Sequence, residues 1–381
     1  MNILLLTDGI TPFVKGGMQR HSQLMAENLA LLGHQITIYH YVQDIAIRAT
    51  KESAFSGEAA SNINLITFTY KDKGRMPGHY LRTQKKMSFQ YLNHLLKTGE
   101  SYDFIYTKGF MGWALLAKRE VLGIKTPISV KFHGMNMFQP QASLKLELQK
   151  YLLRPAVKKI MQMADYVFSY GGKITDIIRD NSDTSVLEVP TGIDDAWIAP
   201  QLPIRSGKLK FLFVGRFDRV KGLPELHQAL EKLEKKFQNW ECHFVGPIPE
   251  AYQLKCSQCI YHGAVYDQAV LRNHYDHCDV LLNTSISEGM PNVILEAMAR
   301  GQMIVATDVG ATSVLVQHKL NGYLVPKADS KLIFSALNDV CRADRNQINE
   351  YQKASLILVK KKTWQQIAPR LVETIRTCIK D

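Results

Sequence analysis

Long hydrophobic runs are missing from this sequence of 381 residues. No apolar stretch approaches the roughly 18 residues that a membrane-spanning helix needs. A signal peptide is missing too, because the chain opens directly on an apolar strand pattern, Ile3–Thr7, without a charged start and a cleavage site. We therefore expect a cytoplasmic protein rather than a membrane-spanning or secreted one.

Cysteine is scarce, and all six cysteines lie from Cys242 onward. In a cytoplasmic protein they are expected to be free thiols. Cys256 and Cys259 form a Cys-x-x-Cys pair with several histidines downstream, which invites a zinc interpretation. No second cysteine pair and no His-x3-5-His pair is spaced to complete a zinc ribbon or finger, so the sequence predicts no metal site.

Acidic residues are outnumbered, and the net charge is +12, spread over both halves of the chain. Such a balance suits nucleic acid, anionic lipid or phosphorylated substrates, and the charge alone does not choose between them. No nucleic-acid-binding module is recognisable, so nucleic acid is not a predicted partner. The stretch 71–86 holds six basic residues and one acidic residue. Two interpretations stay open for it: a solvated surface, or a docking site for anionic lipid or a phosphate-linked acceptor.

The hydrophobic pattern predicts an α/β protein with two parallel-sheet, Rossmann-like domains. Short apolar strands alternate with amphipathic helices up to residue 189, and the alternation restarts at Leu209. Between them, residues 199–207 contain two prolines and a glycine, which is typical of a linker. The length also suits two domains. We place them at 1–195 and 196–362, and a last amphipathic helix at 363–381.

Residues suited to an anionic ligand follow the predicted strands. In open α/β sheets, ligands bind outside the carboxyl ends of the strands. Gly16 and Gly17 precede a helix start, where backbone N–H groups can meet a phosphate. Arg216 and Lys221 follow strand 209–214 and would bind a diphosphate, the arginine as a planar fork and the lysine as a point charge. His133 ends strand 128–132. As isolated features, each of these also has a plain structural explanation.

The most informative stretch is 285–301, Ser-Ile-Ser-Glu-Gly-Met-Pro-Asn-Val-Ile-Leu-Glu-Ala-Met-Ala-Arg-Gly. It follows an apolar strand and opens a helix near Pro291, with Glu288 in the loop and Glu296 inside the helix. This Glu-x7-Glu pattern resembles the signature of retaining glycosyltransferases with the GT-B fold, family four (glycosyl transferases group 1). The resemblance covers nearly the full chain and is weakest from 41 to 100.

The resemblance implies a role for each matching residue. Glu288 would contact the donor sugar, Glu296 would hold the ribose hydroxyls, and His133 would reach the donor sugar or the reaction centre. We therefore expect catalytic roles for Glu288, His133, Arg216 and Lys221. The expected donor-binding residues are Gly16, Gly17, Gly215, Arg216, Lys221, Glu288, Gly289, Met290, Pro291, Asn292 and Glu296.

The resemblance also implies an activity: transfer of a sugar from a UDP- or GDP-linked donor, with retention, to a glycan or lipid-linked acceptor. Synthesis of cell-surface polysaccharide or lipopolysaccharide, with docking at the inner face of the plasma membrane, is the expected setting. The chain has no Asp-x-Asp, so no metal and no cofactor are expected. The last helix would cross back to the first domain. A phosphorylase, an epimerase and a non-catalytic sugar-nucleotide binder remain alternatives.

The sequence also departs from the family pattern. Thr191 stands where relatives commonly have Asn, and Ala311 and Val314 replace the second Gly and the Glu of a Gly-Gly-x-Pro-Glu segment. The last two changes lie at the expected edge of the nucleotide pocket and weaken any prediction of the base.

Overall fold

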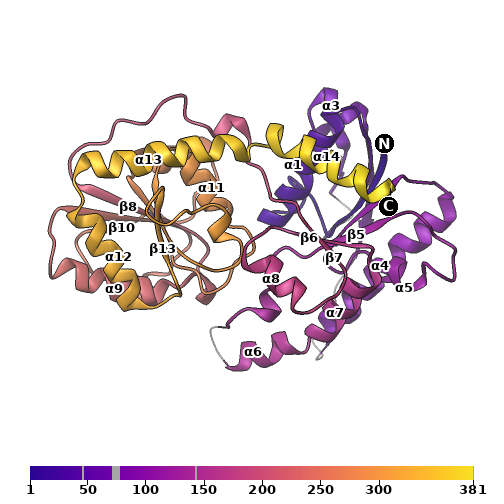
Figure 1. The fold of residues 1–381 in the computed structure, drawn as a ribbon, viewed down its shortest axis with the longest axis horizontal. Helices are drawn as coiled ribbons and strands as arrows, with labels where there is room; N and C mark the ends of the chain where they lie inside the picture. Colours follow the sequence, from indigo (N-terminus) through magenta and orange to yellow (C-terminus); the bar gives the residue numbers. More distant parts are fainter. Residues whose placement is uncertain (45–46, 71–77, 142–143, 381) are drawn as a thin grey trace.

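Two parallel β-sheets, each covered by helices, make up the computed structural model of this protein (Figure 1). The structure describes residues 1–44, 47–70, 78–141 and 144–380. All strand pairs in both sheets are parallel. The predicted fold class, α/β with two Rossmann-like domains, is confirmed.

The first sheet has the strand order β3-β2-β1-β4-β5-β6-β7. Strand β1 pairs with β2 on one side and with β4 on the other, for example Leu4 with Thr37 and with Ile105. The strands are β1 Asn2–Leu6, β2 Gln35–Val42, β3 Ile63–Thr69, β4 Phe104–Lys108, β5 Ile128–Lys131, β6 Tyr166–Ser169 and β7 Ser185–Glu188.

The second sheet has the order β10-β9-β8-β11-β12-β13. Its middle strands are buried along their whole length, as expected for a parallel sheet covered on both faces. The strands are β8 Leu209–Val214, β9 Trp240–Val245, β10 Cys259–Tyr261, β11 Val280–Asn283, β12 Met303–Thr307 and β13 Gly322–Val325.

The helices that surround the first sheet are α1 Gly17–Leu31, α2 Lys51–Ala54, α3 Gly57–Ser61, α4 His79–Thr98, α5 Trp113–Lys118, α6 Leu144–Tyr151, α7 Arg154–Met163 and α8 Lys173–Arg179. Those that follow β8 are α9 Leu223–Glu234, α10 Gln268–His277, α11 Asn292–Ala299, α12 Ser330–Arg342, α13 Arg345–Val359 and α14 Trp364–Lys380.

The chain returns to the first sheet at its end. In Figure 1, α13 (orange to yellow) covers the second sheet and α14 (yellow) lies beside α1 (indigo). Trp364, Ile367 and Leu371 of α14 are buried in one cluster with Ile3 and Leu5 of β1. The first sheet is thus completed by residues that are remote in sequence, and the segment between β7 and β8 is not the sole connection between the two halves.

The first half also holds a short helix, a pair of helices and the basic stretch 71–86. The helix after β4 is only α5, Trp113–Lys118, and two helices, α6 and α7, follow β5. Residues 71–77 of the basic stretch lie outside the described residues. From His79 the chain forms α4, whose buried side includes Met87, Tyr91 and Leu95, so this stretch leads into a packed helix.

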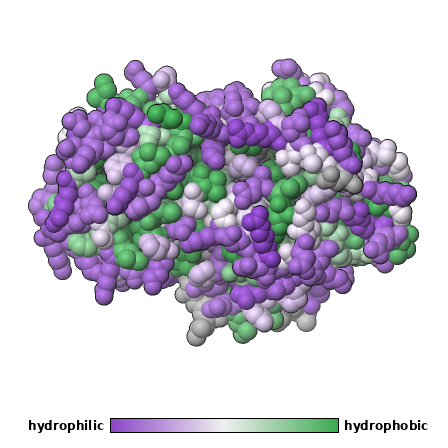
Figure 2. All heavy atoms as spheres, in the orientation of Figure 1, coloured by the Kyte–Doolittle hydropathy of each residue, from purple (hydrophilic) through white to green (hydrophobic). Residues whose placement is uncertain are grey.

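The face seen in Figure 2 is mostly hydrophilic, with hydrophobic residues scattered between polar ones. Among the helices of the described residues, none is both long enough and apolar enough to cross a bilayer.

Candidate active site at the facing sheet edges

Both sheets reverse their strand order next to a central strand. In the first sheet the chain turns from the β1–β2 side to β4, and in the second it turns from the β8–β9 side to β11. Open α/β sheets bind ligands at such switch points, outside the carboxyl ends of the strands. The loop with Gly16 and Gly17 follows β1, the loop with Arg216 and Lys221 follows β8, and Glu288 follows β11. The predicted residues therefore lie at both switch points.

Glu288 is held by two side chains. Its Oε1 lies 2.6 Å from Lys221 Nζ and accepts a hydrogen bond from Ser285 Oγ at 2.7 Å. The two side chains of the ion pair are only 21% and 14% exposed for Lys221 and Glu288. A lysine and a carboxylate at this depth attract each other more strongly than surface charges do. The structure thus joins the predicted phosphate-binding lysine to the predicted sugar-binding glutamate.

The backbone around Glu288 is clamped by the first half of the chain. Gln139 Nε2 donates to the Glu288 carbonyl oxygen at 2.7 Å, and the Glu288 N–H donates to Gln139 Oε1 at 3.3 Å. A Cβ at Gly289 would lie 1.9 Å from the His133 carbonyl oxygen. The loop after β5 and the loop after β11 therefore touch, and only a glycine fits at position 289.

A second glycine packs under the same loop. Gly310 has φ +58°, and a Cβ there would lie 2.3 Å from the Glu288 carbonyl oxygen. The next residue, Ala311, is buried and donates its N–H to the Gly289 carbonyl oxygen at 2.8 Å. Val314 lies against Gly171 of the first half. The segment that departs from the family pattern is thus a support for the Glu288 loop and a contact between the two halves.

The Gly16–Gly17 loop is exposed and adjoins the motif helix. A Cβ at Gly17 would lie 3.4 Å from Asn292 Nδ2, at the first residue of α11. Met290 is buried and Pro291 caps the helix start. The amino ends of α1 and α11 therefore approach each other, an arrangement that offers backbone N–H groups from both halves to one anion.

Gly215 and Arg216 directly follow β8. The N–H of Gly215 donates to the Val245 carbonyl oxygen at 3.0 Å, which fixes the backbone at the strand end. The Arg216 side chain is exposed, and it makes no ion pair or hydrogen bond with any other described residue. A free guanidinium at this strand end is available to a ligand.

Glu296 lies apart from Glu288, on α11, and is partly buried. Its Oε2 accepts a hydrogen bond from Tyr275 OH at 2.8 Å. Burial raises the pKa of this carboxyl, while the Tyr275 hydrogen bond and nearby Arg20 oppose the shift. Glu296 lines a small cavity together with Arg20, His21 and Asn292, between α1 and α11. It can accept hydrogen bonds from hydroxyl groups of a ligand that enters this cavity.

His133 lies at the end of β5 and stays neutral. Its Nδ1 is 2.8 Å from Tyr170 OH. Burial, together with the nearby Lys108 and Lys131, lowers the pKa of His133 to about 3. A neutral imidazole can donate or accept a hydrogen bond, but it does not supply a positive charge at physiological pH.

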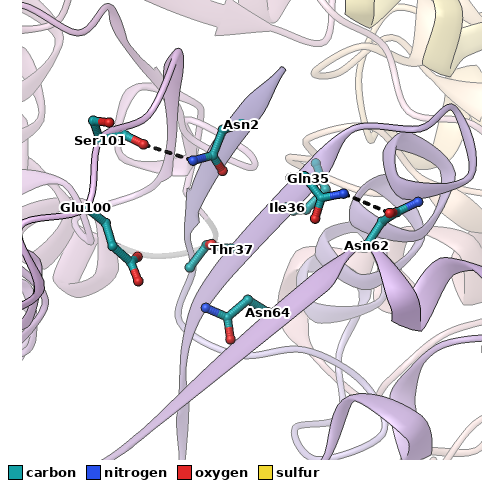
Figure 3. A pocket seen from close by; sticks show the side chains of 8 residues that line it. All are labelled: Asn2, Gln35, Ile36, Thr37, Asn62, Asn64, Glu100 and Ser101. Atoms are coloured by element: carbon teal, nitrogen blue, oxygen red, sulfur yellow. Dashed lines mark hydrogen bonds between the residues drawn. The ribbon is translucent and has the colours of Figure 1, made fainter.

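A larger cavity than the one at Glu296 lies elsewhere. Its volume is about 450 Å³, and it opens at the amino ends of β1, β2 and β3 (Figure 3). Asn2 donates to the Ser101 carbonyl oxygen at 2.9 Å, and Gln35 donates to Asn62 Oδ1 at 2.8 Å. Since these amides are already paired, and the cavity lies at the opposite end of the strands from the motif residues, it is not the candidate site.

No group of three or more His, Cys, Asp or Glu side chains in the described part of the chain is arranged to hold a metal ion. Cys256 and Cys259 are free thiols, and burial raises the pKa of both.

The sequence did not point to several residues of this site. Gln139 and Gly310 hold the Glu288 loop, Tyr275 bonds Glu296, and Arg20 lies beside it. No local pattern marks them, because each acts through a contact made by tertiary folding. A charged residue at the end of a strand was a usable signal for Asp8 and Lys108. Asp8 acts on the Lys108 ammonium, and Lys108 lies near His133.

Comparison with known proteins agrees with this geometry. Residues 208–342 match the profile of the family described as glycosyl transferases group 1. Over 121 residues the chain is 34% identical to a protein named as a teichuronic acid biosynthesis glycosyltransferase of Bacillus subtilis, which is 32% of this chain and 30% of that protein. It is 24% identical over 385 residues to a phosphatidyl-myo-inositol mannosyltransferase of Mycolicibacterium smegmatis, covering 96% of this chain and 91% of the relative.

Solved structures share the whole fold. Sucrose-phosphate synthase from Thermosynechococcus elongatus has a TM-score of 0.79 at 20% identity, covering 99% of this chain and 98% of that one. The Anabaena protein HepE, in complex with UDP and glucose, has a TM-score of 0.66 at 18% identity, covering 99% and 100%. The chain therefore has the fold of GT-B glycosyltransferases.

Proposed function

We propose that this protein is a retaining glycosyltransferase that moves a sugar from a UDP- or GDP-linked donor to a glycan or lipid-linked acceptor. The observation that carries the proposal is the Lys221–Glu288 pair at the end of β11, faced by the Gly16–Gly17 loop of the other sheet. The match to the glycosyl transferases group 1 family spans residues 208–342 and so includes Lys221 and Glu288. The anomeric outcome is inferred from the resemblance of the Glu-x7-Glu motif.

Stabilisation of the leaving diphosphate is the main chemical task. Negative charge grows on the diphosphate as the glycosidic bond breaks, and fixed cations and helix amino ends stabilise it without reorganising solvent. Arg216, Lys221 and the amides at Gly16 and Gly17 would supply this stabilisation. Lys221 already lies in a fixed position because Glu288 holds it. We propose that no metal ion or other cofactor takes part, because Arg216 and Lys221 would supply the positive charge that a metal ion could otherwise supply.

Glu288 and His133 would orient the donor sugar. The Glu288 carboxylate, clamped through Ser285 and Gln139, is positioned to accept hydrogen bonds from sugar hydroxyls. Neutral His133 would contribute a hydrogen bond rather than a charge. Glu296, set deeper along α11, would accept bonds from the ribose hydroxyls. Gly215, Gly289, Met290, Pro291 and Asn292 would shape the same donor site.

The acceptor is proposed to be a glycan or a lipid-linked glycan of the cell surface, as in polysaccharide or lipopolysaccharide synthesis. The names of the relatives, one acting in teichuronic acid biosynthesis and another on phosphatidyl-myo-inositol, support this class. The net charge of +12 and the basic stretch 71–86 would favour docking at an anionic inner membrane surface.

In flotation assays, anionic but not neutral vesicles should carry the protein, and changing Arg82, Lys85 and Lys86 to Gln should weaken this binding. Absence of flotation at low salt would contradict the membrane proposal alone.

The activity is tested by incubating the purified chain with single nucleotide-sugars and measuring free nucleoside diphosphate. We expect release from one donor class, and a loss of about 100-fold in Lys221→Met, because a preorganised charge is removed. Glu225→Gln is the matched control: it breaks the exposed Arg219–Glu225 pair in the same loop region. Binding without release from any donor would favour a non-catalytic binder. Release that requires orthophosphate would favour a phosphorylase, and a changed donor sugar without release would favour an epimerase.

A further inference from the structure

The end of β4 carries a lysine that the donor site does not use. Lys108 Nζ lies 2.7 Å from His21 Nδ1, and burial lowers the pKa of Lys108 to about 7, with Asp8 opposing the shift. Among the described residues, no carboxylate forms an ion pair with Lys108 within 4.0 Å. A partly buried lysine without an anionic partner destabilises the folded protein, and such groups are common at binding sites.

One lysine, two histidines and one carboxylate surround Lys108. Lys131 lies at the end of β5, where its ammonium donates to the Val189 carbonyl oxygen and rests over the Tyr170 ring, 3.7 Å from the centroid. His21 and His133 are both neutral, because burial lowers their pKa values. Asp8 is the single carboxylate of this group, and burial raises its pKa. Lys131 has its own partners, whereas Lys108 has only a neutral imidazole.

Aromatic rings and another lysine border this group on the side of α4. The ring of Tyr80, which is 51% exposed, lies 5.8 Å from the ring of Phe110, two residues after Lys108. Lys85 Nζ lies 5.8 Å from the centre of the Trp113 ring. Since α4 is the described part of the basic stretch, that stretch leads toward the Lys108 end of β4. Exposed aromatic faces beside polar side chains suit a sugar ring.

His21 links this group to the donor side. Its Nδ1 faces Lys108, while its Nε2 is buried and has no hydrogen-bond partner in the structure. The same imidazole lines the small cavity that holds Glu296 and Asn292. A ligand at Lys108 would therefore be separated from the donor cavity by one side chain.

We propose that Lys108, with Asp8 beside it, forms an acceptor subsite that binds a sugar carrying an oxyanion, a phosphate ester or a carboxylate, close to the hydroxyl that receives the glycosyl unit. The Lys108 ammonium pairs with the oxyanion, and the Asp8 carboxylate accepts a hydrogen bond from a sugar hydroxyl. This proposal rests on the proposed function, because it names the acceptor class of the same site.

Binding of an oxyanion changes the state of Lys108 in a measurable way. An opposite charge at contact distance favours the ammonium form and raises the pKa of the amine. A neutral amine reacts with acylating reagents and an ammonium does not. The acetylation rate of Lys108 near pH 7 therefore reports whether an anion lies beside it, independently of any enzymatic turnover.

The experiment is competitive acetylation of the full chain at pH 7, read out residue by residue by mass spectrometry, in the presence of nucleoside diphosphate. The probes are glucose 6-phosphate, glucuronic acid and glucose at equal concentration. We expect an acidic sugar to slow acetylation of Lys108 by about tenfold, since the ammonium fraction rises. Protection by glucose 6-phosphate alone identifies a phosphate, and protection by glucuronic acid alone identifies a carboxylate. Lys118, exposed at the end of α5, is the internal control.

Equal protection by neutral glucose, or no protection by either acidic sugar, would overturn the proposal. A second test uses kinetics once a donor is known. Lys108→Met should lower kcat/KM for the acceptor about tenfold more than it lowers donor hydrolysis, and Lys108→Arg should recover part of the loss because it keeps the cation. Equal losses in both reactions would indicate a structural role only. If no donor is turned over, the proposed function fails while the acetylation result still decides the subsite.

Discussion

At the scale of the residue, Glu288 and Glu296 belong to one short motif but have different surroundings. Glu288 follows a strand end and pairs with Lys221, for which we propose a role at the diphosphate. Glu296 is partly buried on a helix and accepts a hydrogen bond from the Tyr275 hydroxyl. We propose that Glu288 interacts with charge that develops at the reaction centre and that Glu296 accepts hydrogen bonds from neutral hydroxyl groups. Their substitution should therefore affect different kinetic constants.

Glu288→Gln should lower turnover by about 100-fold and change nucleoside diphosphate affinity little, because it loses an interaction at the reacting sugar. Glu296→Gln should weaken nucleoside diphosphate binding, with a smaller effect on turnover. Calorimetric titration and steady-state kinetics on both variants measure this. A similar loss of affinity in both variants, with normal turnover, would contradict the assignment.

Lys108 should affect stability with a specific pH dependence. Its pKa in the folded protein, about 7, lies below the ordinary 10.5, so the unfolded chain binds more protons between these values. The cost to stability is full at pH 7 and disappears toward pH 10.5. The stability of Lys108→Met relative to wild type should therefore be most favourable at pH 7 and decline by pH 10, measured by urea unfolding. A difference that does not change with pH would show that Lys108 titrates normally.

At the scale of the element, the sequence located strands better than helices in the site region. Strands β8 and β12 lie where their apolar runs predicted, since a buried parallel strand is a short run with clear ends. β3 was not predicted, because Ile63–Thr69 is an edge strand that is only partly buried. The strand-end residues Glu288, Lys221 and His133 followed from this pattern. Gln139 and Gly310 did not, because contacts across the two halves leave no periodic signal.

Because Gly310 packs under the Glu288 loop, adding one methyl group at this position should have a large effect on stability and turnover. Gly310→Ala should destabilise the protein by about 1–2 kcal/mol for its left-handed backbone, and further because the Cβ meets the Glu288 carbonyl oxygen. Donor turnover should fall with it, since the Glu288 loop must move. Gly123→Ala is the matched control: its φ is +64°, and nothing lies within 4 Å of the added carbon. Equal effects of the two changes on turnover would contradict the role of Gly310 in supporting the Glu288 loop.

At the scale of the whole molecule, buried histidines make the stability of the fold depend on acidic pH. Burial lowers the pKa to about 4 in His40, His227 and His243 and to about 3 in His133. Since these values lie below the ordinary 6.5, the unfolded chain takes up protons first, and stability falls as pH falls from 6.5 toward 4. Asp8 and Glu296 act in the opposite direction, because burial raises their pKa values.

The free energy of unfolding, measured with urea, should therefore decline steadily as the pH falls below 6.5, by up to about 1.4 kcal/mol per pH unit for each fully titrating histidine. His40→Gln should make this decline shallower. A free energy of unfolding that stays constant down to pH 4.5 would contradict the neutral state of the buried histidines.

The central claim is that the two facing sheet edges transfer a sugar from a nucleotide donor with retention. Proton NMR of the anomeric signals, recorded during turnover of an α-linked nucleotide-sugar, tests it most directly. The account predicts that the donor signal decays and that an α-anomeric product appears first, before any mutarotation of free sugar. A β-anomeric first product would contradict retention, and an unchanged donor signal with every UDP- and GDP-sugar would contradict the proposed activity itself.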